Sequence, residues 1–264
     1  MKAYTLITGA TGGLGKAFAV ECAARGKHLV LTDIAKEKLD TLAACLARTY
    51  GVTIETFACN LMEQSARLSL FNYLEALEAE LELTVNVAGL DFEGGVETLS
   101  SDKLVRVLRV NTEAALDITR HVASIQHADK FYIINVASMA GFYPMPLKAL
   151  YSASKRAIIQ FSLAVREEIR EKGGNILALC PAGLRTNAKV IKKIDAQGFM
   201  GRLTTIDLGK VVSKTLNKVK KGRPIYVPGV INVMINTVAR LFSETIKARM
   251  VYHRWRNANA RIQS

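Results

Sequence analysis

The chain has 264 residues, half of them hydrophobic, and a formal net charge of +13. This length suits one large α/β domain, and no stretch approaches the roughly 18 uncharged apolar residues of a membrane-spanning helix. The charge is uneven: residues 1–188 hold 20 basic and 20 acidic residues, whereas residues 189–264 hold 16 Lys and Arg against 3 Asp and Glu. Such a basic end suits an anionic substrate, an acidic carrier protein or an anionic membrane surface. Because no helix-turn-helix or zinc-finger motif accompanies it, nucleic acid is not an expected partner.

The cysteines are scattered along the chain without a CxxC pair, which disfavours a disulfide framework or a zinc site. They are Cys22, Cys45, Cys59 and Cys180. We therefore expect free thiols in a reducing compartment, the cytoplasm, and the apolar N-terminus is too short to predict a secretory signal peptide. The four histidines are also far apart in the sequence, and no metal site is expected.

The first expected strand, residues 3–8, runs directly into a glycine loop that precedes a helical pattern. Glycines let the backbone approach a pyrophosphate closely, and the helix N-terminus offers unpaired N–H groups. A glycine triplet alone is often only a tight turn, but this placement predicts a dinucleotide-binding loop. The residues expected to contact the cofactor are Gly9, Thr11, Gly12, Gly13, Leu14 and Gly15.

The second expected strand, residues 28–32, ends at Asp33, 18 residues beyond Gly15. At this distance an acidic side chain can accept hydrogen bonds from an adenosine ribose. The alternative role for Asp33 is a helix N-cap. Its carboxylate would repel a 2′-phosphate, Ile34 follows it, and the loop carries no Arg or Lys before Gly15. The sequence therefore favours NAD, with NADP as the less favoured cofactor.

The chain alternates short apolar runs with helical patterns, which is typical of a doubly wound α/β fold with helices on both faces of a mostly parallel sheet. We expect a seven-stranded sheet in a single domain, residues 1–264. The strands are expected at residues 3–8, 28–32, 52–59, 83–87, 130–136, 175–179 and 224–227, and the helices at residues 17–26, 39–50, 64–80, 101–125, 151–172 and 206–221. Ligands of such sheets lie at the carboxyl ends of the strands, where Gly9, Asp33, Asn60 and Gly89 are placed. Asn60 and Leu61 either meet an adenine edge there or form a simple turn.

Tyr151 and Lys155 open one of these helices, and their spacing places a phenol and an ammonium one turn apart on the same face. A phenol has a pKa of about 10, and a fixed ammonium beside it favours the phenolate and lowers that pKa. The pair then suits proton transfer to or from an alcohol oxygen. Taken alone, this spacing is more often an ordinary amphipathic pair, so the rest of the chain decides between the two interpretations.

In this order and spacing, the motifs resemble those of the short-chain dehydrogenase/reductase family over almost the whole chain. Its TGxxxGxG, Asn-Asn-Ala-Gly and Pro-Gly motifs match Thr8, Gly9, Gly13 and Gly15, then Asn86, Ala88 and Gly89, then Pro181 and Gly183. The family's catalytic Asn, Ser, Tyr and Lys positions fall on Asn111, Ser138, Tyr151 and Lys155. Thr186 falls where the family usually meets the nicotinamide carboxamide. Three residues depart from the pattern: Asn60 in place of Asp, Val87 in place of the second Asn, and an extra Ala182.

The resemblance implies hydride transfer between a carbinol carbon and the nicotinamide ring. It implies that Tyr151 takes or gives the proton of the substrate hydroxyl. It also implies that Lys155 lowers the pKa of Tyr151 and binds the nicotinamide ribose. Ser138 would hydrogen-bond the substrate oxygen, and Asn111 would hold a water in a proton relay that ends at Lys155. The resemblance also implies cofactor contacts from Asn86, Ala88, Gly89, Pro181, Gly183 and Thr186.

The C-terminal part is the segment that the family pattern explains least. Residues 184–205 are a candidate lid with possible glycine hinges, or an ordinary surface loop. The apolar spacing of residues 230–251 predicts one helix with a wide apolar face, and a basic and aromatic tail follows it. Residues 230–264 are therefore expected to form an amphipathic basic segment. This segment either covers the substrate pocket, packs against another subunit or lies on a membrane surface, in that order of preference.

The leading hypothesis is an NAD-dependent oxidoreductase acting on a hydrophobic secondary alcohol or ketone, such as a hydroxysteroid or a 3-hydroxyacyl chain, with an anionic group as a possible handle. The alternative is a non-enzymatic dinucleotide-binding regulator that uses the basic end as a partner surface. By family analogy we expect a homodimer or homotetramer built on the helices at residues 101–125 and 151–172.

Overall fold

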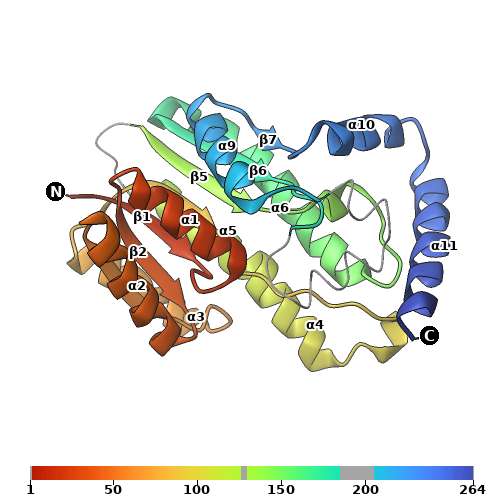
Figure 1. Cartoon of the computed structure of the whole chain (residues 1–264), viewed down its shortest axis with the longest axis horizontal. Helices are drawn as coiled ribbons and strands as arrows, with labels where there is room; N and C mark the ends of the chain where they lie inside the picture. Colours follow the sequence, from red (N-terminus) through yellow and green to blue (C-terminus); the bar gives the residue numbers. More distant parts are fainter. Residues whose placement is uncertain (1, 126–129, 185–204, 264) are drawn as a thin grey trace.

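The computed structural model describes residues 2–125, 130–184 and 205–263 (Figure 1). Seven strands form one parallel sheet in the order β3-β2-β1-β4-β5-β6-β7, and this confirms the doubly wound prediction. The strands are β1 (Ala3–Thr8), β2 (His28–Asp33), β3 (Ile54–Ala58), β4 (Glu80–Asn86), β5 (Phe131–Val136), β6 (Gly174–Leu179) and β7 (Ile225–Tyr226). The central strands are nearly continuous apolar runs because both of their faces are buried.

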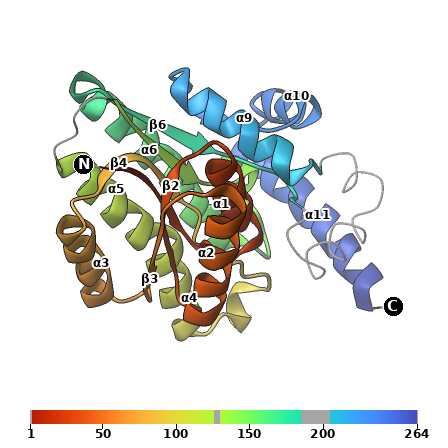
Figure 2. The same ribbon diagram turned by 60° about the vertical axis from the view of Figure 1, so that its left-hand side comes forward.

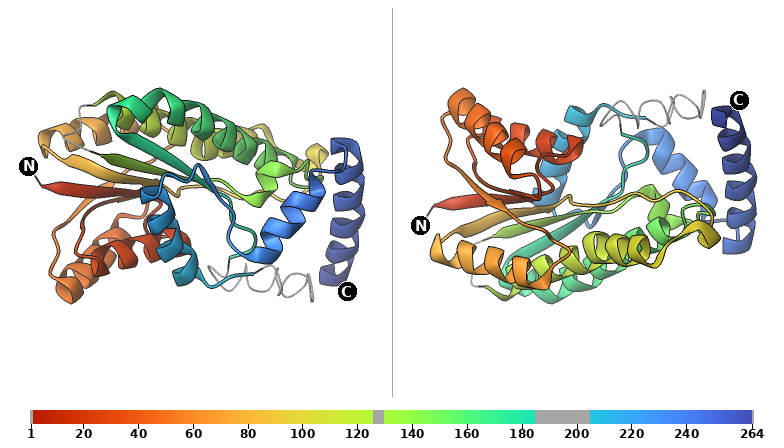
Figure 3. Two further views of the ribbon diagram at one scale, coloured as in Figure 1. Left: turned by 90° about the horizontal axis from the view of Figure 1, so that it is seen from above. Right: turned by 90° about the horizontal axis from the view of Figure 1, so that it is seen from below.

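Helices cover both faces of the sheet (Figures 2 and 3). One layer holds α1 (Gly13–Ala24), α2 (Lys36–Tyr50) and α9 (Leu208–Lys220), which bury Phe18, Leu42 and Val211 in one core cluster. The other layer holds α3 (Gln64–Ala76), α5 (Ala114–Ser124) and α6 (Ala149–Ile169), which bury residues such as Leu70 and Ile118 in a second cluster. Helix α3 ends four residues earlier than expected, and β4 starts three residues earlier, at Glu80.

The helix expected at residues 101–125 is interrupted. It consists of α4 (Ser101–Leu108), a π-helical turn (Arg109–Glu113) and α5. Asn111 lies inside the π turn, where its side chain bonds to the backbone of Leu90 on a neighbouring loop. Single π turns inside α-helices are frequent at functional sites. The apolar spacing of the sequence does not reveal this turn, because the contact that accompanies it comes from a distant segment.

The prediction of one helix over residues 230–251 is wrong. The structure has two helices, α10 (Val230–Ala239) and α11 (Glu244–Gln263), separated at Arg240–Ser243. The Ser243 hydroxyl accepts a hydrogen bond from the Ile246 amide, and the Ser243 carbonyl accepts one from the Lys247 amide. Ser243 therefore caps α11 and starts it in a new direction. Across the described ranges, no helix has both the length and the apolarity needed to cross a membrane.

Candidate active site

The glycine loop between β1 and α1 is packed backbone to backbone against the end of β4. Gly9 has a φ of +62°, and a Cβ added there would lie 2.8 Å from the Cα of Ala88. A Cβ on Gly15 would lie 2.1 Å from the Gly9 carbonyl oxygen. The Thr8 hydroxyl accepts hydrogen bonds from the amides of Val87 and Ala88, which fixes the loop on the sheet. The loop keeps its backbone open at the start of α1, and this shape fits a pyrophosphate.

Asp33 lies directly beside this loop. Its Oδ2 accepts hydrogen bonds from the amide and the hydroxyl of Thr11, at 3.0 and 2.8 Å, and its Oδ1 accepts one from the Ala35 amide at 3.3 Å. Asp33 is not the N-cap of α2, because that position is occupied by Ala35. A half-buried carboxylate that touches the glycine loop fits an adenosine ribose.

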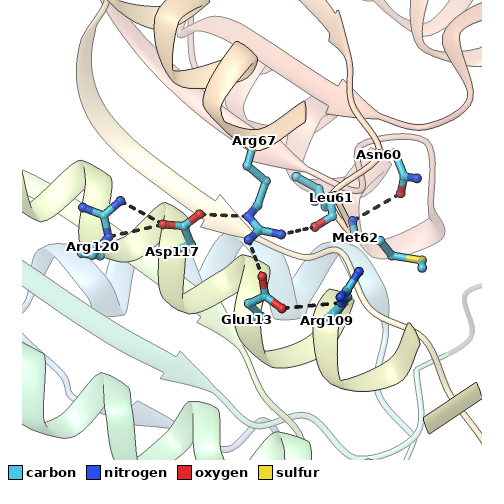
Figure 4. A network of polar contacts seen from close by, with 8 residues as sticks. All are labelled: Asn60, Leu61, Met62, Arg67, Arg109, Glu113, Asp117 and Arg120. Carbon is cyan, nitrogen blue, oxygen red and sulfur yellow. Dashed lines mark hydrogen bonds and ion pairs between the residues drawn. The ribbon is translucent and has the colours of Figure 1, made fainter. Parts of the chain in front are cut away.

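The turn after β3 is held by its own side chains and by a buried arginine (Figure 4). Asn60 accepts a hydrogen bond from the Met62 amide and donates one to Glu63, so its side chain takes part in the turn itself. Leu61 is buried, and its carbonyl accepts a hydrogen bond of 2.8 Å from Arg67. The turn is therefore rigid, with its position set by α3.

Sequence reasoning missed Arg67. Its side chain is 2% exposed and forms ion pairs with Glu113, in the π turn, and Asp117, in α5 (Figure 4). Burial lowers the pKa of Arg67, but the hydrogen bonds that its guanidinium donates to these two carboxylates outweigh this effect and raise the pKa above its ordinary value. The guanidinium thus joins the turn at Leu61 to the helix segment that carries Asn111. No local pattern reveals it, because its partners lie 46 and 50 residues further along the chain.

The Asn86 side chain points into the core. Its amide donates to Asn135 at 2.8 Å and to Thr119 at 3.2 Å, and Asn135 in turn donates to Ser162 at 3.0 Å. This buried network joins β4, β5, α5 and α6 and holds the Asn86 side chain in the core. The expected cofactor contact of Asn86 stays a prediction. At Gly89, an added Cβ would lie 3.4 Å from both the Asn111 Oδ1 and the Lys155 Nζ, so the glycine leaves space between these two groups.

The four residues of the expected catalytic set converge at the carboxyl ends of β4 and β5. Ser138 follows β5 and accepts a hydrogen bond from the Ala140 amide at 3.1 Å. Tyr151 and Lys155 lie on the first turns of α6, with the Lys155 Nζ 5.8 Å from the centre of the Tyr151 ring. Lys155 is buried and donates to the Val136 carbonyl at 2.8 Å.

Asn111 is buried, and its amide group is fully engaged. Oδ1 accepts from the Leu90 amide at 2.6 Å, and Nδ2 donates to the Leu90 carbonyl and to Ser154. The side chain therefore fixes the loop after β4. A relay water in contact with Lys155 would need other atoms of this turn.

The pKa of Tyr151 is shifted in the direction opposite to the one expected. Burial raises it to about 12, Asp91 adds to the shift, and a hydrogen bond with Ser138 lowers it. Lys155 does not offset the burial, because its ammonium points to the Val136 carbonyl and lies beside the phenol ring. Burial also lowers the pKa of Lys155 to about 8. At neutral pH the phenol therefore holds its proton.

Asp91 and its neighbour Lys148 are also residues that the sequence did not single out. Lys148 pairs with Asp91 at 2.7 Å and with Glu93 at 3.8 Å, and its Nζ lies 5.5 Å from the Tyr151 ring centre. The charge of Asp91 acts directly on the phenol. Because Asp91 and Lys148 are 57 residues apart, their pairing is visible only in the structure.

The segment after β6 is hydrogen-bonded to the turn at Ser138. The Pro181 carbonyl accepts hydrogen bonds from the Met139 amide at 2.9 Å and from the Ser138 hydroxyl at 3.4 Å. Gly183 follows, and Leu184 forms a parallel bridge with Ile206. Thr186 and almost all of the candidate lid, residues 185–204, lie outside the described residues.

Comparison with known proteins identifies the family of the chain. The family model for short chain dehydrogenases matches residues 3–197. A very-long-chain 3-oxoacyl-CoA reductase of Anas platyrhynchos is 33% identical over 198 residues, which are 72% of this chain and 62% of the reductase. The match thus spans less than two thirds of that relative's length.

Two solved structures resemble the chain over most of its length. A 7β-hydroxysteroid dehydrogenase is 25% identical with a TM-score of 0.85, covering 94% of this chain and 96% of the other. A short-chain dehydrogenase from Sphingobium yanoikuyae in complex with NADPH is 26% identical with a TM-score of 0.76, covering 86% and 88%. Together with the glycine loop and the grouping of Ser138, Tyr151 and Lys155, these matches show that the chain belongs to the short-chain dehydrogenase/reductase family.

Proposed function

We propose that the protein is an NAD-dependent oxidoreductase that interconverts a hydrophobic secondary alcohol and its ketone. The observation that carries this proposal is the position of Tyr151, which lies within hydrogen-bonding reach of Ser138, beside Lys155, at the edge of the sheet that holds the glycine loop. The same four-residue set argues against the regulator hypothesis, because a binding protein has no use for a buried acid beside a buried ammonium.

The residues of the glycine loop would hold the pyrophosphate, Asp33 the adenosine ribose and Lys155 the nicotinamide ribose. The bound nicotinamide would supply the hydride chemistry. In the reductive direction, Tyr151 donates its proton to the ketone oxygen, and Ser138 donates a hydrogen bond that stabilises the charge developing there. The phenolate that remains after the transfer attracts the Lys155 ammonium, which lies beside the Tyr151 ring and turns away from the Val136 carbonyl to reach the phenolate oxygen.

The cofactor preference is tested at Asp33. We expect the wild type to bind NADH at least about tenfold more tightly than NADPH, because the carboxylate would face the 2′-phosphate as a like charge. In Asp33→Ser this ratio should shrink, and Asp102→Ser, which removes an exposed carboxylate from α4, should leave it unchanged. Fluorescence titration with both cofactors measures the ratio. Equal affinities in the wild type would refute the preference for NAD.

The substrate class is tested with a panel of hydroxysteroids, 3-hydroxyacyl thioesters and simple secondary alcohols. Related proteins act on a very-long-chain 3-oxoacyl-CoA and on a hydroxysteroid, by their names, and both substrates carry a large apolar part. We expect turnover, followed by the absorbance of reduced nicotinamide, with at least one of the first two classes. A silent panel together with intact NADH binding would favour the regulator.

The proposed assembly is a homodimer or homotetramer through α5 and α6. A groove beside them is lined by apolar side chains such as Leu116, Phe161 and Val165 and by charged ones such as Arg120 and Glu168, a mixture that suits contact with another subunit. Free thiols at Cys22, Cys59 and Cys180, all buried, support a reducing compartment such as the cytoplasm.

A further inference from the structure

Helix α10 has its polar and apolar sides reversed relative to a helix that faces water. Asn232 and Asn236 are 1% and 7% exposed, and they face the body of the protein. Asn232 donates to the Pro228 carbonyl at 2.8 Å, and Asn236 accepts a hydrogen bond of 3.0 Å from the hydroxyl of Tyr143. The outer side carries Val230 and Met234, which are 78% and 62% exposed. A surface helix normally shows the opposite arrangement.

Exposed apolar residues also occur beyond α10. Leu241 is 84% exposed in the turn between the helices, and Ile246 and Met250 are exposed on α11. We call Val230, Met234, Val238, Leu241, Ile246 and Met250 the C-terminal apolar surface. Single exposed apolar residues are ordinary on any protein, but a set that recurs along two adjoining helices and the turn between them marks a contact surface.

Basic residues accompany this surface. Residues 230–264 contain six Lys and Arg against one acidic residue, Glu244. Lys247 pairs with Glu244 at 2.7 Å, whereas Arg240 and Arg249 are exposed. A second copy of the same surface would bring like charges together, which disfavours self-association. An anionic lipid surface attracts the basic residues and accepts the apolar ones.

The C-terminal apolar surface lies at the active-site end of the molecule. Helices α10 and α11 stand beyond the carboxyl ends of the strands, and α11 crosses that end of the fold (Figures 1 and 3). The bond between Asn236 and Tyr143 ties α10 to the loop that separates Ser138 from Tyr151 in the chain. A partner seated on this surface is therefore at the same end of the molecule as the catalytic residues.

We propose that the C-terminal apolar surface docks the protein on an anionic lipid bilayer, with its active-site end facing the lipid. The reason for such docking rests on the proposed function: a hydrophobic alcohol or ketone that is dissolved in the bilayer enters the site without crossing water. The docking is peripheral, through two helices that lie against the headgroups.

Flotation of the full-length protein with lipid vesicles tests this proposal. One set of vesicles is pure phosphatidylcholine, and the other contains about one third phosphatidylglycerol as the anionic lipid. We expect binding to the anionic vesicles that weakens with added salt, because the attraction between exposed charges is screened.

Two paired variants separate the apolar from the electrostatic contribution. Met234→Glu with Leu241→Glu should lower partitioning into both kinds of vesicle by about tenfold or more, since burial of a single leucine favours the bound state by about that factor. Arg240→Gln with Arg249→Gln should lower partitioning into anionic vesicles by roughly 25-fold, at about fivefold for each of the two basic residues, and leave partitioning into neutral vesicles unaffected. Leu68→Glu is the matched control, because it changes an exposed leucine on α3, away from this surface.

Several outcomes would overturn the proposal. They are no flotation with anionic vesicles, equal flotation of the wild type and the Met234/Leu241 variant, or a light-scattering mass that halves in that variant and so assigns the surface to a second copy. Turnover of a water-soluble alcohol without vesicles separates the two proposals. A protein that turns over the alcohol but does not bind vesicles refutes the docking proposal and leaves the proposed function standing. A protein that binds cofactor but shows no turnover counts against the proposed function.

Discussion

Tyr151→Phe lowers turnover by about 10²–10⁴-fold, the usual contribution of a positioned acid or base, and leaves the affinity for NADH nearly unchanged. The substitution removes one hydroxyl and keeps the ring that packs beside Lys155. The transfer of the proton then has to proceed without the phenol, whereas the glycine loop and Asp33, which would hold the other end of the cofactor, are untouched.

The pH dependence adds a second signature to this prediction. Because burial raises the pKa of Tyr151 to about 12, the protonated form predominates up to that pH. Ketone reduction, which uses the protonated phenol, should not lose this donor across the neutral and mildly alkaline range. Alcohol oxidation uses the phenolate and should accelerate as the pH rises toward the pKa.

Steady-state kinetics in both directions and an NADH titration are the measurements for Tyr151→Phe. Tyr226→Phe is the control, since it removes the hydroxyl of another buried tyrosine, on β7. A Tyr151→Phe variant with a rate close to that of the wild type would remove Tyr151 from the mechanism.

Lys155→Met is expected to abolish most turnover and to change how stability depends on pH. The pKa of Lys155 is about 8 in the folded protein, against an ordinary value of 10.5. Below pH 8 the lysine is protonated in both the folded and the unfolded state, and the folded state bears the cost of a buried charge. Between these two pKa values the unfolded chain binds more protons, so the wild type gains stability as the pH rises.

The size of this gain follows from the shift in pKa. Relative to Lys155→Met, the wild type should gain roughly 3 kcal/mol in free energy of unfolding between neutral pH and about pH 10.5. Urea denaturation of both proteins at several pH values measures the difference, and Lys210→Met on the surface of α9 corrects for the loss of a charge. A constant difference across this range would mean that Lys155 does not titrate as a buried ammonium.

The fold was predictable because its signals are local. Each strand is a short apolar run between turns, and the glycine loop and Asp33 occupy positions that follow from the order of strands and helices. The residues that escaped prediction depend on distant partners. Arg67 meets Glu113 and Asp117 across two helices, and the π turn at Asn111 accompanies a contact with Leu90.

The sequence indicated which residues make up the candidate site, but it did not predict their pKa values. The spacing of Tyr151 and Lys155 correctly placed both side chains on the same helix. It could not show that the ammonium turns to the Val136 carbonyl, or that the phenol is buried deeply enough to raise its pKa. Likewise, the apolar pattern of residues 230–251 predicted helix, but Ser243 divides it, and burial of two asparagines reverses the side that faces solvent.

The pairing of β1 with β4 bears on how the protein folds. The two strands pair from Ala3 with Glu80 to Thr8 with Asn86, so about 78 residues separate each pair along the chain. The entropy of closing so large a loop has to be overcome before these contacts stabilise the chain, which makes the pairing a slow event. The bonds from Val87 and Ala88 to Thr8 form only when the two halves of the sheet have joined. The nascent chain therefore acquires a rigid glycine loop late, after β4 has been inserted beside β1.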